Sequence, residues 1–230
     1  MVSATARAGC LIVLDSSGKP VETFAGNGIN GAWDMTALDL GNAAVLFVSN
    51  VLNGTVAANG KMVDGGTVLR ILLAIDNSQP ANIPREINRT IIGTGFGERT
   101  DPAALVTGPT GVALGPDGTL YVADTLANRI GAIPDALFRV TSAGNGATVS
   151  RAGALNQPLG LAVAPNGDIL TVNAGDGNMV ETRPGGEQVT VKNVDTTGTG
   201  GGTLFGLALT PSRDGVYFVN DGNNTLNLLH

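Results

Sequence analysis

The sequence is poor in the residues that most enzymes and metalloproteins use for chemistry. It contains one cysteine and one histidine, and charged residues make up only 14% of its 230 positions. A single cysteine excludes an internal disulfide and a zinc site built from thiolates. The single histidine is the last residue, His230, which excludes a Ser-His-Asp triad and a histidine zinc cage. We predict no catalytic residue and no cofactor.

Basic clusters and long apolar runs are also missing. The 13 Lys and Arg residues are scattered and the net charge is −6, so we expect no nucleic-acid partner. No apolar run approaches the ~18 residues of a transmembrane helix, and residues 1–7 lack the apolar core of a signal peptide. Little lysine with abundant Thr, Asn and Gly suits an exported protein. We therefore expect a periplasmic or extracellular location if a leader has been removed.

Glycine is abundant instead, at 34 residues, while hydrophobic residues make up 43% of the chain and aromatic residues 4%. This composition indicates a folded chain with many turns, built on small and β-branched side chains. Cys10 lies in an apolar segment, residues 10–14, and we interpret it as a small buried side chain. The single tryptophan, Trp33, begins a predicted strand, and we expect it in the core.

Three segments repeat one pattern. In each, a glycine precedes a short apolar strand, a tight turn follows, and a second apolar strand ends on Asp or Asn. Asp-Gly or Asn-Gly between two apolar runs favours a β-hairpin, because glycine readily adopts positive φ. The segments are residues 109–124 (PTGVALGPDGTLYVAD), 158–173 (PLGLAVAPNGDILTVN) and 204–220 (LFGLALTPSRDGVYFVN), with a degenerate fourth copy at 33–50.

Two weaker strands follow the hairpins, and no stretch has convincing helical periodicity. The two later intervals between copies are close to the ~40–50 residues of a four-stranded propeller blade. The first interval is longer, so we interpret residues 53–66 and 77–89 as insertions, and 196–202 as an exposed loop. The sequence therefore predicts an all-β protein, a β-propeller of four-stranded antiparallel blades in one domain, 1–230.

The ends do not complete a standard ring. The blade-like units are 9–24 (partial, an outer hairpin), 33–94, 109–153, 158–194 and 204–230. Three arrangements fit: a closed ring of five positions, a C-terminal fragment of a longer protein, or an open arc that associates with another copy. We expect the fragment, because the chain enters in the middle of a blade. Open edges are templates for strand addition, so we also predict self-association.

The segment 109–130, PTGVALGPDGTLYVADTLANRI, resembles an NHL repeat. Its Pro-x-Gly start, its Asp-Gly turn, Tyr-Val-Ala-Asp and Asn-Arg-Ile carry the resemblance, and the other copies match more loosely. The resemblance implies a β-propeller, usually six-bladed, often extracytoplasmic in bacteria and most often a binding platform. We therefore expect a bacterial, non-enzymatic module that binds or scaffolds a protein, a glycan or another small-molecule ligand.

The most regular polar feature is the set of strand-end residues, Asn50, Asp124, Asn173 and Asn220. In a propeller, equivalent strand ends come together near the channel mouth, where their oxygens could hold Ca²⁺. We favour Asx turns at these positions, in which each side chain bonds the nearby backbone, because one Asp among three Asn supplies little charge.

Two alternatives for chemistry follow from similar propellers. A Ca²⁺-dependent lactonase, similar to the gluconolactonase propellers, needs no histidine but does need a Glu at the channel, and no Glu of this sequence is assigned there. Lyases that resemble the NHL family rely on histidines, so we do not expect that activity. Loops 173–181 and 220–227 fall short of the EF-hand pattern, and we interpret them as turns.

Overall fold

The computed structural model describes residues 8–76, 83–101, 105–195, 197 and 204–230. Apart from the single-turn helix α1 (Thr55–Ala58), its regular elements are strands, and every sheet is antiparallel with its strands in sequence order. The predicted all-β fold is confirmed. We number the four larger sheets I to IV.

The N-terminal hairpin consists of β1 (Cys10–Leu14) and β2 (Pro20–Ala25). Sheet I contains β3 (Ala32–Asp39), β4 (Ala43–Asn50), β5 (Val63–Ala74), β6 (Arg85–Asp101) and β7 (Leu105–Thr107). Sheet II contains β8 (Pro109–Leu114), β9 (Leu120–Asp124), β10 (Arg129–Ile133) and β11 (Ala147–Arg151). Sheet III contains β12 (Pro158–Val163), β13 (Ile169–Asn173), β14 (Asn178–Thr182) and β15 (Gln188–Asn193). Sheet IV contains β16 (Leu204–Leu209), β17 (Val216–Asn220) and β18 (Thr225–Leu229).

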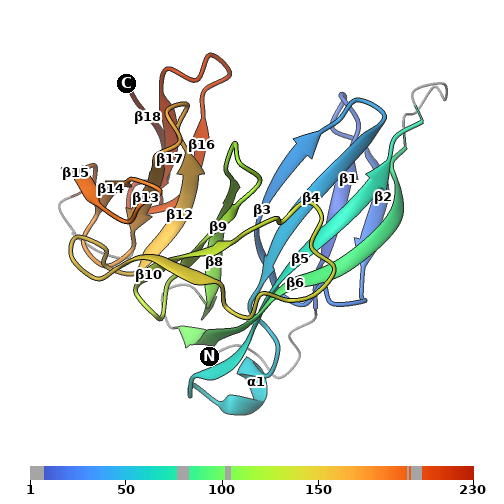
Figure 1. Cartoon of the computed structure of the whole chain (residues 1–230), viewed down its shortest axis with the longest axis horizontal. Helices are drawn as coiled ribbons and strands as arrows, with labels where there is room; N and C mark the ends of the chain where they lie inside the picture. The colour runs from blue at the N-terminus through green and yellow to red at the C-terminus, as the bar shows by residue number, and fades with distance from the viewer. Residues whose placement is uncertain (1–7, 77–82, 102–104, 196, 198–203) are drawn as a thin grey trace.

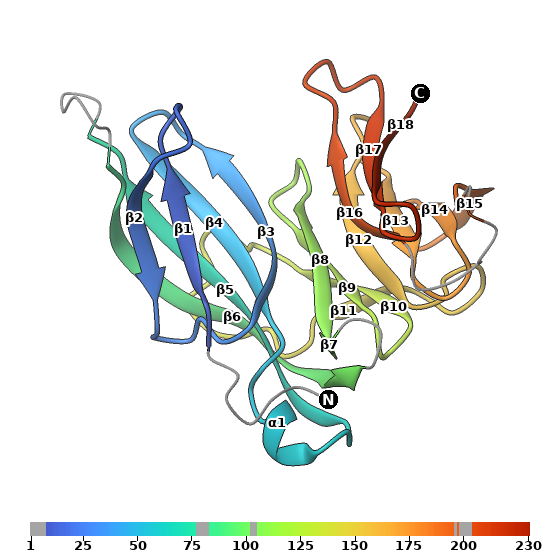
Figure 2. The same ribbon diagram turned by 180° about the vertical axis from the view of Figure 1, so that it is seen from behind.

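The four sheets are arranged as the blades of a β-propeller. They follow one another along an arc with the β1–β2 hairpin at one end and sheet IV at the other (Figures 1 and 2). One apolar core fills each interface between consecutive sheets, because alternate side chains of a strand point to opposite faces. Phe47 packs between sheets I and II, Leu161 between II and III, and Phe218 between III and IV.

Hydroxyl groups also join neighbouring sheets. The Ser49 Oγ in sheet I donates to the Thr110 carbonyl oxygen of sheet II at 2.7 Å. Thr125, in turn, donates its Oγ1 to the Pro158 carbonyl oxygen of sheet III at 2.7 Å. All of these groups are buried, so each bond satisfies a backbone carbonyl that has left water.

The turn chemistry follows the sequence prediction. Gly118 and Gly167 have φ of 81° and 91°, the positive values that glycine adopts without strain. The side chains of Asp117 and Asn166 accept hydrogen bonds from the backbone amides of Thr119 and Asp168 at 3.0 Å. The two predicted hairpins, β8–β9 and β12–β13, are therefore confirmed.

Sheet I accommodates its extra residues mainly in longer strands and not in the two predicted insertions. Part of the first predicted insertion is α1, but β5 already begins at Val63. In the second, β6 begins at Arg85, and residues 77–82 lie outside the described residues. Sheet I thus lengthens its outer hairpin to strands of 12 and 17 residues. Of the predicted loop at 196–202, only Thr197 is described.

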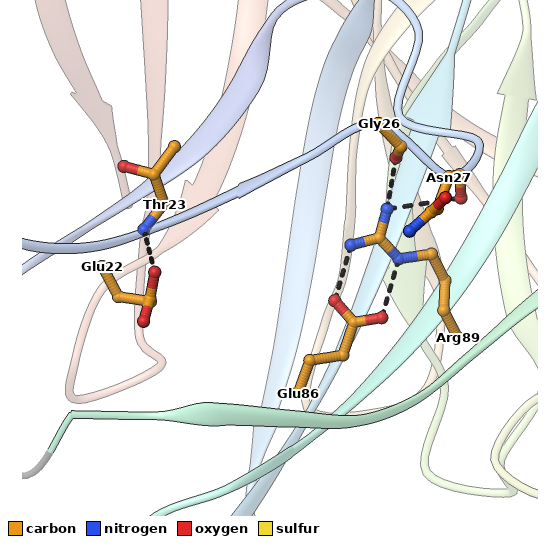
Figure 3. A network of polar contacts seen from close by, with 6 residues as sticks. All are labelled: Glu22, Thr23, Gly26, Asn27, Glu86 and Arg89. Atoms are coloured by element: carbon orange, nitrogen blue, oxygen red, sulfur yellow. Dashed lines mark hydrogen bonds and ion pairs between the residues drawn. The ribbon is translucent and has the colours of Figure 1, made fainter.

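Arg89 joins the N-terminal hairpin to sheet I (Figure 3). Its guanidinium donates to both carboxylate oxygens of Glu86, at 3.0 Å and 2.6 Å, and to the carbonyl oxygens of Gly26 and Asn27 after β2. The Arg89 side chain is only 9% exposed, and its charge-assisted bonds to Glu86 are partly shielded from water. Phe24 adds an apolar contact by packing with Leu69 of sheet I.

Both ends of the arc carry exposed apolar side chains. Ile12 and Leu14 on β1 are 58% and 55% exposed, and Leu226 and Leu228 on β18 are 68% and 44% exposed. Cys10 shares the outer face of β1 with Ile12 and is exposed, so the prediction of a buried Cys10 is wrong. The apolar run did not show which face of the hairpin sheet I covers.

Among the described residues, no helix has the length and apolar character needed to cross a membrane.

Candidate ligand site at the axial channel

The four strand-end residues predicted as a ring are all buried, with exposed fractions of 0% or 1%. Each ends the second strand of its sheet and stands opposite the first residue of the inner strand. Their side-chain bonds go to the same sheet or to the loop before it. The residues are Asn50, Asp124, Asn173 and Asn220, and their respective partners include Asn30, Arg129, Ala154 and Asp195.

Asp124 forms a buried ion pair across the β9–β10 ladder. Its Oδ2 lies 2.8 Å from the Arg129 Nε, and the two side chains are 1% and 2% exposed. Arg129 also donates to the Asn145 carbonyl oxygen at 2.6 Å and to the Thr148 Oγ1 at 3.0 Å. Burial raises the pKa of Asp124, and the Arg129 guanidinium opposes that shift. The Asp and Arg of the repeat motif are therefore a structural pair.

The predicted Asx turn is confirmed at Asn220, whose Oδ1 accepts from the Gly222 amide at 3.0 Å. Asn173 instead uses its Nδ2 to reach the Ala154 carbonyl oxygen at 2.8 Å and the Asp176 Oδ1 at 3.0 Å. Over the residues that the structure describes, no group of three or more His, Cys, Asp and Glu is placed to hold a metal ion. A calcium ion at the strand ends stays the untested alternative to Asx turns.

The inner strands β3, β8, β12 and β16 line the channel, and each carries a β-bulge at the same place. In β8, Pro109 faces Asp124 while Val112 faces Val122, so the strand holds one residue more than its partner there. The corresponding irregularity occurs in β3, β12 and β16. Bulges re-aim the backbone and the side chains beside them. The third residue of the inner strand lies at the bulge, and it is Gly111, Gly160 or Gly206 in three strands and Asp34 in β3.

Glycine is needed at two of these positions because the next inner strand approaches closely. A Cβ at Gly111 would lie 2.5 Å from the Leu159 carbonyl oxygen, and a Cβ at Gly160 would clash with the Phe205 carbonyl oxygen. In β3 the equivalent residue, Asp34, contacts the next inner strand through its side chain. Its Oδ2 accepts a hydrogen bond from the Val112 amide of β8 at 3.0 Å. Burial raises the pKa of Asp34, and the Val112 and Met35 amides oppose this shift.

A cavity of about 370 Å³ opens where these bulges meet, and we call it the mouth cavity. Its lining consists of Ala32, Trp33, Asp34, Gly111, Leu159, Gly160, Phe205 and Gly206. A second cavity of about 300 Å³ is lined by the residues that follow the bulges, and Asp34 borders both. Trp33, which we expected in the core, is only partly buried and lines the mouth cavity.

Sequence reasoning missed the role of Asp34, although an acid in a glycine position of the repeat was a usable signal. It also missed Glu98 on β6, which is fully buried beside Gly65 and Gly108. Neither carboxylate oxygen of Glu98 makes a hydrogen bond of good geometry. Burial raises its pKa to about 7, and the Asn53 backbone amide opposes the shift only in part.

No protein-family profile and no curated protein matches this sequence. Solved structures match it in fold. A luciferin-regenerating enzyme gives a TM-score of 0.58 over 94% of this chain at 12% identity, and a gluconolactonase from Xanthomonas campestris gives 0.56 over 94% at 14%. A protein of unknown function from Bacteroides caccae gives 0.57 over 96% at 14%. The chain spans 64% of the first two structures and 71% of the third. Such low identity shows the β-propeller fold alone.

Proposed function

We propose that this chain is a non-enzymatic, NHL-type propeller that binds a small ligand in the mouth cavity. The observation that carries the proposal is the lining, which combines Trp33, Phe205 and Asp34 around about 370 Å³. Concave sites with aromatic walls and a few polar groups are typical of small-molecule binding, and ~300–1,000 Å³ is their usual size. The repeat motif at residues 109–130 supports the NHL-type assignment, with an extracytoplasmic bacterial setting.

The test uses Trp33, the only tryptophan of the chain, as a local reporter. A ligand of the mouth cavity changes its fluorescence and raises the melting temperature by mass action. The variant Gly206→Leu should block binding without disturbing the fold, because a Cβ there meets nothing within 4 Å. Gly185→Leu is the matched control, since its Cβ also meets open space but Gly185 does not line the cavity.

A broad screen of metabolites should return ligands that bind the wild type and Gly185→Leu but not Gly206→Leu. Ligands that bind Gly206→Leu with full affinity would place the binding site elsewhere. A screen with no response in fluorescence or melting temperature would overturn the proposal.

Ca²⁺-dependent lactone hydrolysis is a second candidate function, and the buried Glu98 is the acid that could hold the ion, although it lines neither the mouth cavity nor the second cavity. A buried carboxylate without good hydrogen bonds is costly unless a cation or a proton satisfies it. If Glu98 bound Ca²⁺, calcium would raise the melting temperature, a chelator would reverse the rise, and Glu98→Gln would abolish it. We expect no calcium effect and no lactone turnover, and a positive result in both assays would favour the hydrolase.

A further inference from the structure

Asp34 is a carboxylate with no cationic partner among the described residues. Its carboxylate accepts a hydrogen bond from the Val112 amide at 3.0 Å, and the described residues that line its two cavities include no Lys, Arg or His. Among the described residues, no ion pair includes Asp34. Asp124, the other acid of the strand ends and bulges, is neutralised by Arg129 at 2.8 Å. The negative charge of Asp34 is thus available to pair with a cationic ligand that enters the cavity.

The walls around Asp34 favour an organic cation over a metal ion. Trp33 and Phe205 line the same cavity, and aromatic faces attract ammonium groups through the negative charge of the ring face. Ca²⁺ requires about six to eight oxygen ligands, whereas this lining offers one carboxylate among apolar side chains and glycines. A ligand ammonium would satisfy the carboxylate and pack its carbon skeleton on the rings.

The three glycines make room for such a ligand. Gly111, Gly160 and Gly206 occupy the positions equivalent to Asp34, so at this position only one of the four inner strands carries a side chain. The net charge of −6 also favours the approach of a cation over that of an anion.

We infer that the mouth cavity binds a small organic cation with a primary ammonium group, paired with the Asp34 carboxylate and packed against Trp33 and Phe205. This inference rests on the proposed function, because it names the ligand class of the same cavity.

The experiment compares two probes of nearly equal shape, phenethylammonium and its neutral analogue 2-phenylethanol, by titration of Trp33 fluorescence and by calorimetry. The ammonium should bind at least about tenfold more tightly, a difference of about 1.4 kcal/mol, and added salt should reduce this preference. Asp34→Asn keeps an oxygen for the Val112 amide, and it should remove the preference while leaving 2-phenylethanol unaffected. Asp117→Asn is the matched control, because it makes the same charge change on an exposed turn.

The outcomes separate the two proposals. Equal affinity for both probes would overturn the cation inference and leave the ligand-binding proposal intact. A response to neither probe in the millimolar range would overturn the inference, and the metabolite screen with Gly206→Leu then decides the proposed function on its own. The comparison of probes on the wild type needs no variant, so it stands even if Asp34→Asn fails to fold.

Discussion

Sheets II and III are two versions of the same blade. They share strand order, an Asp-Gly or Asn-Gly turn, an inner-strand bulge and a neighbour on each face. They differ where the second strand ends. In sheet II the end of the second strand is stabilised by the Asp124–Arg129 ion pair. In sheet III it is stabilised by the Asn173 amide, which donates to the Asp176 Oδ1 and to the Ala154 carbonyl oxygen.

The difference shows that the motif charges are not required for the blade itself. In sheet III the residue in the place of Arg129 is Asn178, whose Oδ1 accepts from Asn193 at 3.1 Å. In each sheet one buried oxygen, the Oδ1 of Asp124 or of Asn173, makes no hydrogen bond of good geometry with the described residues. A charged pair and a set of amides thus support one backbone, but only the pair leaves a buried charge behind when one member is removed.

Removing Arg129 should have the largest effect. Arg129→Met leaves Asp124 buried without a counter-ion, and we expect a loss of about 3–5 kcal/mol in the free energy of unfolding. Urea unfolding at neutral pH measures it. Asn178→Ala in sheet III is the matched control and should cost no more than about 1 kcal/mol.

Asp124→Asn should also destabilise, because it strands the Arg129 charge, although an Asx turn at this position would have made the change nearly neutral. The double variant Asp124→Asn with Arg129→Met should recover part of the loss. Single and double variants of equal stability to the wild type would show that sheet II, like sheet III, does not depend on charge.

Substitutions in the β8–β9 and β12–β13 turns should destabilise sheets II and III to a similar degree. Gly118→Val and Gly167→Val each place a β-branched residue at positive φ, and we expect similar losses of about 1–3 kcal/mol. The control is Gly185→Val, where the φ is not positive and a Cβ meets open space. Valine tolerated at 118 or 167 as well as at 185 would contradict the turn assignment.

Glu98 extends the comparison to a buried carboxylate that forms no ion pair within the described part of the chain. Its pKa of about 7 in the fold lies above the ordinary value of 4.5, so the folded state binds the proton more tightly than the unfolded state. Stability from this group is therefore full below pH 4.5 and declines as the pH rises to about 7. Glu98→Gln should flatten this decline and stabilise the protein at pH 8 by about 1 kcal/mol. Parallel pH profiles for the variant and the wild type would contradict the assignment.

Substitutions on the exposed outer faces of β1 and β18 should change self-association more than the free energy of unfolding. Sheets II and III are covered on both faces, whereas Ile12 and Leu226 are 58% and 68% exposed. We expect concentration-dependent self-association by light scattering, reduced by Ile12→Lys and Leu226→Lys, with each change within about 0.5 kcal/mol in unfolding. The exposed Lys192→Glu is a control that keeps the apolar faces. A strictly monomeric wild type at all concentrations would refute this prediction.

The local chemistry of the repeat made the hairpins of sheets II to IV readable from the sequence. Pro116-Asp117-Gly118 between two apolar runs is compatible with few structures other than a β-hairpin, and the structure has a hairpin there. Cys10 was misjudged because an apolar strand with two apolar faces does not reveal which one is covered. Asp34 was missed because its copy was matched only in outline. Its role depends on β8, which lies far along the chain. Glu98 gave no sequence signal, since its burial is set by Gly65 and Gly108 from other segments.

Every strand in sheets I to IV pairs only with strands adjacent to it in sequence. A blade therefore needs no later segment to complete its hydrogen-bonded ladder, and the loops to be closed are short. During synthesis each blade can form soon after it leaves the ribosome and then serve as the surface on which the next one condenses. When blades are added one after another in this way, only the edge of the most recently formed blade is exposed, rather than a whole unfolded chain. That edge is then the part that a chaperone has to cover.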